Sequence, residues 1–261
     1  MIEGASVAIC ARNIEDLRNA QKELNAYKAD GINELLIYEA DISDPNDVGG
    51  FVKFCASRFE SVHILVNNAG VHGPKCGIDD VSFDIGDWIK AIHINLVGTM
   101  LMCKEVIPLM KRNNGGKIIN LSGGGATSPM PGMSAYAASK AAVVRMTETF
   151  AVELKKYNID VNAVAPGAMN TRLLDDVLRN GKGKVPDEYY DKLLKQKEGG
   201  GTPPDLAASL CVYLASEKSD GITGKLISAV WDDWKNLHER LGELSSDVYT
   251  LRRIVPEDRI K

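Results

Sequence analysis

Tyr136-Ala137-Ala138-Ser139-Lys140 opens a segment in which apolar residues recur at helical spacing as far as Leu154. Residues four apart lie on one face of a helix, so the Tyr136 hydroxyl and the Lys140 ammonium are expected to converge. A neighbouring cation favours the phenolate and lowers a tyrosine pKa from its ordinary value of about 10. Such a tyrosine serves as a general acid or base near neutral pH. The alternative is an amphipathic helix that carries both side chains incidentally, and the surrounding sequence decides between the two.

Short apolar runs lie on both sides of this helix and alternate with longer helical patterns. The runs are Val7–Cys10, Leu35–Tyr38, Ile64–Val66, Ile118–Leu121, Val161–Val164 and Lys225–Ala229. Helical patterns cover Ile14–Tyr27 and about Ile85–Met110. Ser43 or Asp44 caps a further helix, with Pro45 in its first turn. This alternation predicts an α/β fold in which helices cover both faces of a doubly wound parallel sheet.

The composition is that of a soluble globular protein and argues against several functions. The 261 residues are 44% apolar and 25% charged, and the net charge of -4 gives no general reason to bind nucleic acid or an anionic membrane. No apolar run approaches the roughly 20 residues that span a bilayer, and no basic region precedes an apolar run at the start. The five cysteines include no Cys-x-x-Cys pair, so neither a disulfide framework nor a metal site is indicated. We expect a cytoplasmic protein without a nucleic-acid or membrane partner.

One segment within the main domain departs from the alternation of strands and helices. Residues 171–202 are charged and glycine-rich, with short helical patterns near Leu173–Leu178 and Tyr189–Lys197. Glycines at both ends of a mobile segment suit an active-site lid. A surface excursion without function is the alternative. We expect one domain over residues 1–230 that includes this segment.

The C-terminal extension, residues 231–261, contains one helical pattern over Asp232–Leu244 and ends in polar residues. Trp231 and Trp234 are too large to stand exposed without a partner. We expect them to pack on the domain or on a second subunit.

Polar clusters follow the carboxyl ends of the predicted strands, where open parallel sheets bind ligands. The motifs in and between these clusters are, in chain order, Asp41-Ile42, Asn67-Asn68-Ala69-Gly70, Asn95 within Ile94-Asn95-Leu96, Asn120-Leu121-Ser122, Tyr136-x-x-x-Lys140 and Pro166-Gly167-x-x-x-Thr171. Jointly they make about residues 4–229 closely similar to the short-chain dehydrogenase/reductase (SDR) family. The resemblance implies a Rossmann-like, three-layer αβα fold.

The resemblance also implies a reaction, which is hydride transfer between NAD(P) and a small secondary alcohol or ketone. Tyr136 then exchanges a proton with the substrate oxygen, Lys140 lowers the Tyr136 pKa and holds the nicotinamide ribose, and Asn95 supports a water in the proton relay. The implied cofactor contacts, besides Tyr136 and Lys140, are Asp41 and Ile42 at the adenine, Asn67, Ala69 and Gly70 at the adenosine ribose, and Pro166, Gly167 and Thr171 towards the nicotinamide. A homodimer or homotetramer through the helices around Asn95 and after Tyr136 is implied as well.

The residues after the first predicted strand bear on the choice of cofactor. An acidic side chain at this place accepts hydrogen bonds from the adenosine ribose and repels a 2'-phosphate. The sequence here is Ala11-Arg12-Asn13, which offers no carboxylate and a guanidinium able to grip phosphate. We therefore expect NADP(H) to be preferred, with NAD(H) as a second possibility. The alternative is that Arg12 merely faces solvent.

Two departures from the family pattern are visible. The family's catalytic serine lies thirteen residues before the tyrosine, and Gly123 occupies that position here. We expect Ser122 to take the role, with its hydroxyl brought to the substrate oxygen by a one-residue longer loop built on Gly123-Gly124-Gly125. The alternative is that Ser122 only satisfies backbone groups.

The second departure concerns the family's first strand, glycine-rich turn and helix, which bind the cofactor pyrophosphate. Met1–Ala5 resembles the end of that helix, so this strand–turn–helix unit is expected to be missing. A late start codon or a truncated chain explains this more readily than an evolved variant. An alternative function follows from the loss, namely a catalytically silent binding or scaffold protein that keeps the shell of the fold, or an inactive fragment.

Overall fold

The computed structural model describes residues 1–27, 33–244, 247–255 and 258, and it contains a parallel sheet system flanked by helices. The strands are β1 (Val7–Ala11), β2 (Leu35–Glu39), β3 (Ile64–Asn67), β4 (Gly116–Leu121), β5 (Ile159–Ala165) and β6 (Leu226–Ser228). Each contains or overlaps one of the six predicted apolar runs. The predicted strands are therefore confirmed.

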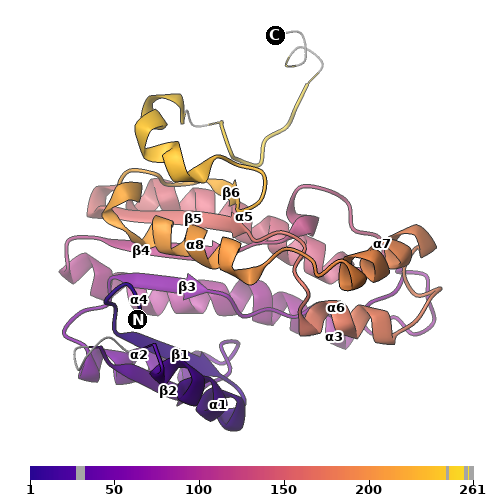
Figure 1. Ribbon diagram of the computed structural model, residues 1–261, viewed down its shortest axis with the longest axis horizontal. Helices are drawn as coiled ribbons and strands as arrows, with labels where there is room; N and C mark the ends of the chain where they lie inside the picture. The colour runs from indigo at the N-terminus through magenta and orange to yellow at the C-terminus, as the bar shows by residue number, and fades with distance from the viewer. Residues whose placement is uncertain (28–32, 245–246, 256–257, 259–261) are drawn as a thin grey trace.

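The strands form two separate sheets rather than one. β1 pairs with β2, while β3, β4, β5 and β6 pair in that order, and every pairing is parallel. Within the described residues no ladder joins β1 to β3. Figure 1 shows the two-stranded sheet beside the four-stranded sheet, on the side of β3.

Helices connect successive strands and begin at recognisable signals. Their bounds are α1 Ile14–Asn25, α2 Pro45–Arg58, α3 Ile85–Ile92, α4 Thr99–Arg112, α5 Ser134–Leu154, α6 Arg172–Arg179, α7 Asp187–Glu198 and α8 Pro204–Ala215. Short 3-10 helices are η2 Gly124–Ala126, η3 Lys155–Tyr157, η4 Glu217–Ser219 and η5 Trp234–Glu243. Of the two residues proposed to cap α2, Asp44 does so, accepting from the Asn46 N–H at 2.7 Å, with Pro45 as the first helical residue.

Neighbouring residues of β4 face opposite layers of the protein. Ile118 packs in the apolar cluster that α2, α4 and α5 form on one face. Ile119 belongs to the cluster on the other face, which α8, β6 and η5 complete. Because successive strand side chains point to opposite faces, this alternation produces the predicted layers of helix, sheet and helix.

The helical pattern predicted from Ile85 is one run of 28 residues, interrupted by a π-helical turn, η1, at His93–Gly98. By length and composition this run could cross a membrane, with a mean hydropathy of 1.3 in its most apolar window. The expectation that no apolar segment is long enough is therefore wrong. The run nevertheless supplies Cys103, Val106 and Met110 to the core.

The C-terminal extension differs from the single helix that its pattern predicts. Over Trp234–Glu243 it forms 3-10 turns, and the backbone at Arg240 leaves helical geometry. Trp234 packs against α8, and its indole N–H donates to the Ala229 carbonyl at 3.1 Å. Trp231 is 86% exposed, so it does not pack on its own chain.

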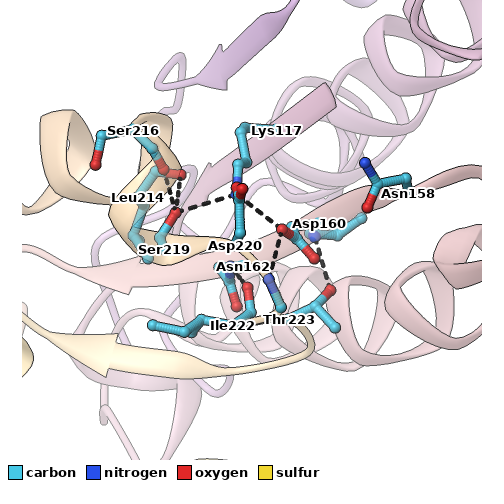
Figure 2. A network of polar contacts seen from close by, with 12 residues as sticks. Lys117, Asn158, Asp160, Asn162, Leu214, Ser216, Ser219, Asp220, Ile222 and Thr223 are labelled. Carbon is cyan, nitrogen blue, oxygen red and sulfur yellow. Dashed lines mark hydrogen bonds and ion pairs between the residues drawn. The ribbon is translucent and has the colours of Figure 1, made fainter. Parts of the chain in front are cut away.

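A polar network ties the four-stranded sheet together at the amino ends of its strands (Figure 2). The Lys117 ammonium, at the start of β4, lies 2.8 Å from an Asp160 carboxylate oxygen and 2.7 Å from one of Asp220. It also donates to the Ser219 hydroxyl at 3.2 Å. The network therefore joins β4, β5 and the turn that follows α8, at the edge of the sheet opposite to the carboxyl ends of the strands.

Candidate active site

Tyr136 and Lys140 lie on one face of the first two turns of α5, as their spacing predicts. The Lys140 nitrogen lies 5.8 Å from the centroid of the Tyr136 ring. It donates to the Leu121 carbonyl at the end of β4, at 2.7 Å. Lys140 is only 5% exposed, so α5 holds a cation inside the protein against the carboxyl end of the sheet.

Asn95 joins this pair from the π-helical turn η1. Its side chain is fully buried, and its amide donates to the Val71 carbonyl at 2.8 Å and the Ser139 hydroxyl at 2.9 Å. Its amide oxygen accepts from the Val71 N–H at 2.8 Å. π-Helical turns are frequent at functional sites. The turn thus fixes Asn95 between the loop after β3 and the Tyr136 helix.

Gly70 brings these residues to one point. A Cβ at Gly70 would lie 3.4 Å from the Asn95 amide oxygen and 3.5 Å from the Lys140 nitrogen. The loop after β3 therefore passes directly over both side chains. Of the predicted residues, Gly70, Asn95, Tyr136 and Lys140 are brought together.

The ionisation of the pair differs from the expectation. Burial, with a smaller effect of Tyr189, raises the Tyr136 pKa to about 12. Burial also lowers the Lys140 pKa to about 8. The expected lowering of the Tyr136 pKa is not seen in this arrangement, in which burial of the phenol raises that pKa.

The end of β4 places Gly123, not Ser122, against the tyrosine. A Cβ at Gly123 would lie 2.3 Å from the Tyr136 hydroxyl oxygen. Gly123 has an extended backbone, so the side chain of Ser122 points to the opposite side. Ser122 is buried, and its hydroxyl has no partner within the described residues. The expectation that a longer loop brings the Ser122 hydroxyl to the substrate oxygen therefore stays a prediction, and within the described residues this hydroxyl makes no hydrogen bond to Tyr136.

Two asparagines of the motifs serve the sheet rather than the ligand edge. The Asn67 amide donates to the Asn120 amide oxygen at 2.8 Å, and the Asn120 amide donates to the Thr147 hydroxyl at 2.9 Å. These bonds connect β3, β4 and α5 in the interior. Ala69, by contrast, lies exposed in the loop beyond β3.

The predicted adenine side lies at the end of β2. Burial alone would raise the Asp41 pKa, but hydrogen bonds from Ser43 and the charges of Arg12 and Lys90 together lower it. Ile42 packs against η1, where a Cβ at Gly98 would lie 2.8 Å from the Ile42 Cδ1 atom. The two cations and the carboxylate therefore share one region beside the strand ends.

Pro166, Gly167 and Thr171 form the turn that leads from β5 into the segment of residues 171–202. Gly167 has a φ of +90°, and a Cβ there would lie 2.9 Å from the Thr202 hydroxyl oxygen. Thr171 immediately precedes α6. The turn after β5 therefore contacts Thr202, at the far end of the segment, so that the two ends of the predicted lid lie next to each other.

The segment of residues 171–202 covers the tyrosine. The two predicted short helices are present as α6 and α7. Their buried residues Leu174, Val177 and Leu193 form one apolar cluster, against which Tyr136 packs. This contact explains part of the burial of the phenol.

His72 is a residue of the site that the sequence reasoning missed. It lies two residues after Gly70, and its ring meets the Tyr136 ring edge-on with centroids 4.9 Å apart. It is 9% exposed, and its Nδ1 atom has no hydrogen-bond partner within the described residues. The available signal was its position directly after the Asn67–Gly70 motif.

Comparison with known proteins agrees with this geometry. The sequence pattern of the short chain dehydrogenase family matches residues 1–181. The chain belongs to the short chain dehydrogenase family. It is 32% identical over 225 residues to dehydrogenase/reductase SDR family member 4 of Caenorhabditis elegans, which covers 86% of this chain and 84% of that protein.

Two solved structures resemble this short chain dehydrogenase and were determined with different cofactors. An NAD+-bound xylitol dehydrogenase matches with a TM-score of 0.76 and 26% identity, covering 87% of this chain and 88% of that chain. A gluconate 5-dehydrogenase from Burkholderia cenocepacia J2315, in complex with NADP and tartrate, matches with a TM-score of 0.72 and 25% identity, covering 85% and 83%. This short chain dehydrogenase is therefore an oxidoreductase with the Rossmann-like fold that its motifs predict.

Proposed function

We propose that this enzyme transfers a hydride between NADP(H) and a small secondary alcohol or ketone, with Tyr136 as the acid/base. The observation that carries the proposal is the convergence of Tyr136, Lys140 and Asn95 beneath Gly70. Fluorescence titration with NADPH, followed by assays of ketone reduction, tests it. Failure to bind NADPH and to reduce any ketone would overturn it.

The buried cation fits a nicotinamide cofactor. A lysine ammonium has three donors, and within the described residues Lys140 directs one of them to the Leu121 carbonyl. The other donors are free to bind the ribose hydroxyls of the nicotinamide side. Gly70 leaves room beside Lys140 that a larger side chain would fill.

The chain's own residues supply proton transfer and orientation. The bound cofactor supplies the hydride. Tyr136, whose pKa stands at about 12, keeps its proton at neutral pH and is poised to donate it to a carbonyl oxygen. Asn95 holds the loop after β3 in place, and α6 and α7 exclude water from the tyrosine.

Preference for NADP(H) over NAD(H) rests on Arg12. The Arg12 and Lys90 charges act on Asp41, so both cations stand near the end of β2, where the adenosine side of the cofactor is expected. A guanidinium binds a 2'-phosphate in a bidentate manner. Arg12→Ala should lower the ratio of NADPH to NADH affinity, while Arg18→Ala, which removes an exposed partner of Glu15, should leave the ratio unchanged. An equal affinity of the parent enzyme for both cofactors would contradict the preference.

Cofactor binding also depends on the break in the sheet. β1 and β3 each have one edge without a partner strand within the described residues, and the side chains of Ile64 and Val66 on β3 are 39% and 46% exposed. β1 and β3 nevertheless border one apolar cluster, through Cys10 and Leu65. We propose that a further parallel strand, followed by a glycine-rich turn and a helix, belongs between them and that its turn holds the pyrophosphate.

An enzyme extended with such a unit should bind NADPH more tightly and melt at a higher temperature than the 261-residue chain. The matched control carries the same unit with its turn glycines replaced by alanines, which should restore stability but not binding. Tight NADPH binding and cooperative melting of the 261-residue chain alone would contradict this part of the proposal.

A second candidate function is favoured by one observation. Gly123 provides no hydroxyl beside Tyr136, which suits a binding protein that has kept the fold without turnover. NADPH binding without reduction of any ketone would support it.

We also propose a homodimer or homotetramer in a reducing, cytoplasmic setting. α5 presents Val152 with 79% exposure, and all five cysteines are free thiols. Sedimentation analysis with Val152→Asp tests the association.

A further inference from the structure

We propose that His72 is a catalytic residue, whose Nδ1–H donates a hydrogen bond to the substrate oxygen beside the Tyr136 hydroxyl. This inference rests on the proposed function. It assigns to an imidazole the second hydrogen bond that Ser122 was expected to give.

The first argument is the space at the end of β4. A Cβ at residue 123 would lie only 2.3 Å from the Tyr136 hydroxyl oxygen, which is too close for both atoms to keep their places. No side chain at this position can share the substrate oxygen unless the tyrosine moves. The Ser122 side chain points away from this point, because adjacent strand residues face opposite sides. A donor on another element meets neither obstacle.

The second argument is the placement of His72. It projects from the loop after β3, which also carries Gly70 over Lys140 and Asn95. Its ring stands at 86° to the Tyr136 ring, with centroids 4.9 Å apart. A substrate oxygen that reaches the phenol therefore lies within the same small region as the imidazole.

The third argument is the unpaired nitrogen. The Nδ1 atom is buried and lacks a partner within the described residues, although buried polar groups are nearly always hydrogen-bonded. Such an exception at a candidate site calls for a ligand group. A substrate oxygen satisfies it.

The charge state is compatible with a neutral donor. Burial and the nearby Lys75 and Lys140 charges lower the His72 pKa to about 4, against the opposing effect of Asp176. At neutral pH the ring is therefore uncharged, with one nitrogen that donates and one that accepts. A neutral imidazole suits an uncharged ketone or secondary alcohol, whereas an imidazolium would favour an anionic substrate.

Kinetics of cyclohexanone reduction with NADPH test the role. His72→Phe keeps the aromatic contact with Tyr136 but removes the donor, so kcat/KM should fall by about 100-fold. NADPH affinity should stay unchanged. His72→Gln, which keeps an amide donor, should recover part of the loss. The matched control is His63→Phe, since His63 is exposed at the amino end of β3 and should have no effect.

Two kinetic outcomes overturn the inference while leaving the proposed function intact. One is reduction by His72→Phe at the parent rate while Tyr136→Phe is inactive. The other is a loss of similar size in Ser122→Ala with none in His72→Phe, which would return the role to the serine.

A binding measurement decides the matter even if cyclohexanone is not reduced. In protein labelled uniformly with ¹⁵N, titration with cyclohexanol should move the His72 Nδ1 resonance saturably and leave that of His63 in place. A His72 resonance that does not move while other resonances of the site do would overturn the inference. Absence of turnover with a saturable shift would instead count against the proposed function alone.

Discussion

The two sheets of this enzyme contrast in how they are held. The four-stranded sheet has apolar clusters on both faces, a polar ladder through Asn67, Asn120 and Thr147, and the Lys117 network at its amino edge. The two-stranded sheet packs against α1 and borders the large cluster through the partly buried Ala8, Cys10 and Tyr38, while its buried Leu35 and Leu36 lie outside the apolar clusters of the described residues. The contrast teaches that Tyr136 and Lys140 are built against the four-stranded sheet, the firm half, whereas the strand ends at which we propose the adenosine side of the cofactor belong to the two-stranded sheet, the weaker half.

The largest effect is expected at the four-stranded sheet, where we propose that proton transfer takes place. Tyr136→Phe removes the transferable proton but keeps the ring in place against α6 and α7, so ketone reduction should fall by ~100- to 10,000-fold. NADPH affinity, measured by fluorescence, should change little. Full turnover in the variant would show that Tyr136 does not transfer the proton, and the proposed link between the four-stranded sheet and the chemistry would then fail.

Core substitutions measure the contrast directly. Ile118→Ala empties a fully buried position of β4 and should lower the free energy of unfolding by ~2–5 kcal/mol. Leu36→Ala in β2 should cost less, at or below the low end of that range, because Leu36 belongs to none of the apolar clusters of the described residues. Urea unfolding followed by circular dichroism gives both values. Equal losses would show that the two sheets unfold as one unit of uniform strength.

Desolvation in the firm half should appear in the pH dependence of stability. The folded Lys140 releases its proton near pH 8, whereas the unfolded lysine keeps it to about 10.5. Between these values the unfolded state binds more protons, so the free energy of unfolding rises with pH. The rise is about 3 kcal/mol from this group.

Other groups titrate in the same window, including thiols whose burial raises their pKa. The quantity to measure is therefore the difference in free energy of unfolding between the parent enzyme and Lys140→Met. The free energy of unfolding of the parent enzyme minus that of Lys140→Met should increase from pH 8 to 10.5, and a constant difference would show that Lys140 is not charged and buried at neutral pH.

The smallest effects concern the helix caps of the two halves. Asn13 caps α1 beside the two-stranded sheet, and Asp44 caps α2, which packs in the large cluster. Replacing either by alanine should cost about 1 kcal/mol. If the halves differ as described, Asn13→Ala should speed hydrogen exchange in β1 and β2 only, while Asp44→Ala lowers global stability. Identical exchange patterns would weaken the contrast.

The sequence predicted the elements well because the signals are local. Each apolar run became a strand, Asp44 and Pro45 began α2, and the spacing of Tyr136 and Lys140 placed both on one helical face. The convergence of Asn95 with this pair followed from the family's motifs. Such features depend on spacing along the chain, which a sequence displays.

The failures are those that depend on distance between elements. The rise in the Tyr136 pKa comes from burial beneath α6 and α7, which the 136–140 spacing does not report. The approach of Gly123 to the phenol and the position of His72 depend on how β4, the loop after β3 and α5 meet. Ser122 was expected to bond the substrate oxygen, but the alternation of side chains at the end of β4 directs its side chain to the side opposite to Tyr136.

The π-helical turn at His93–Gly98 has a consequence for the phase of the long helix. The turn accommodates one residue more than an α-helical turn, and each residue rotates the following helix by roughly 100°. α3 can therefore face α5 and the site, while α4 turns Val106 and Met110 into the core against α2. Deletion of a single residue such as Val97 would make the helix continuous. Either the contact of α3 with α5 or the packing of α4 against α2 would then be lost.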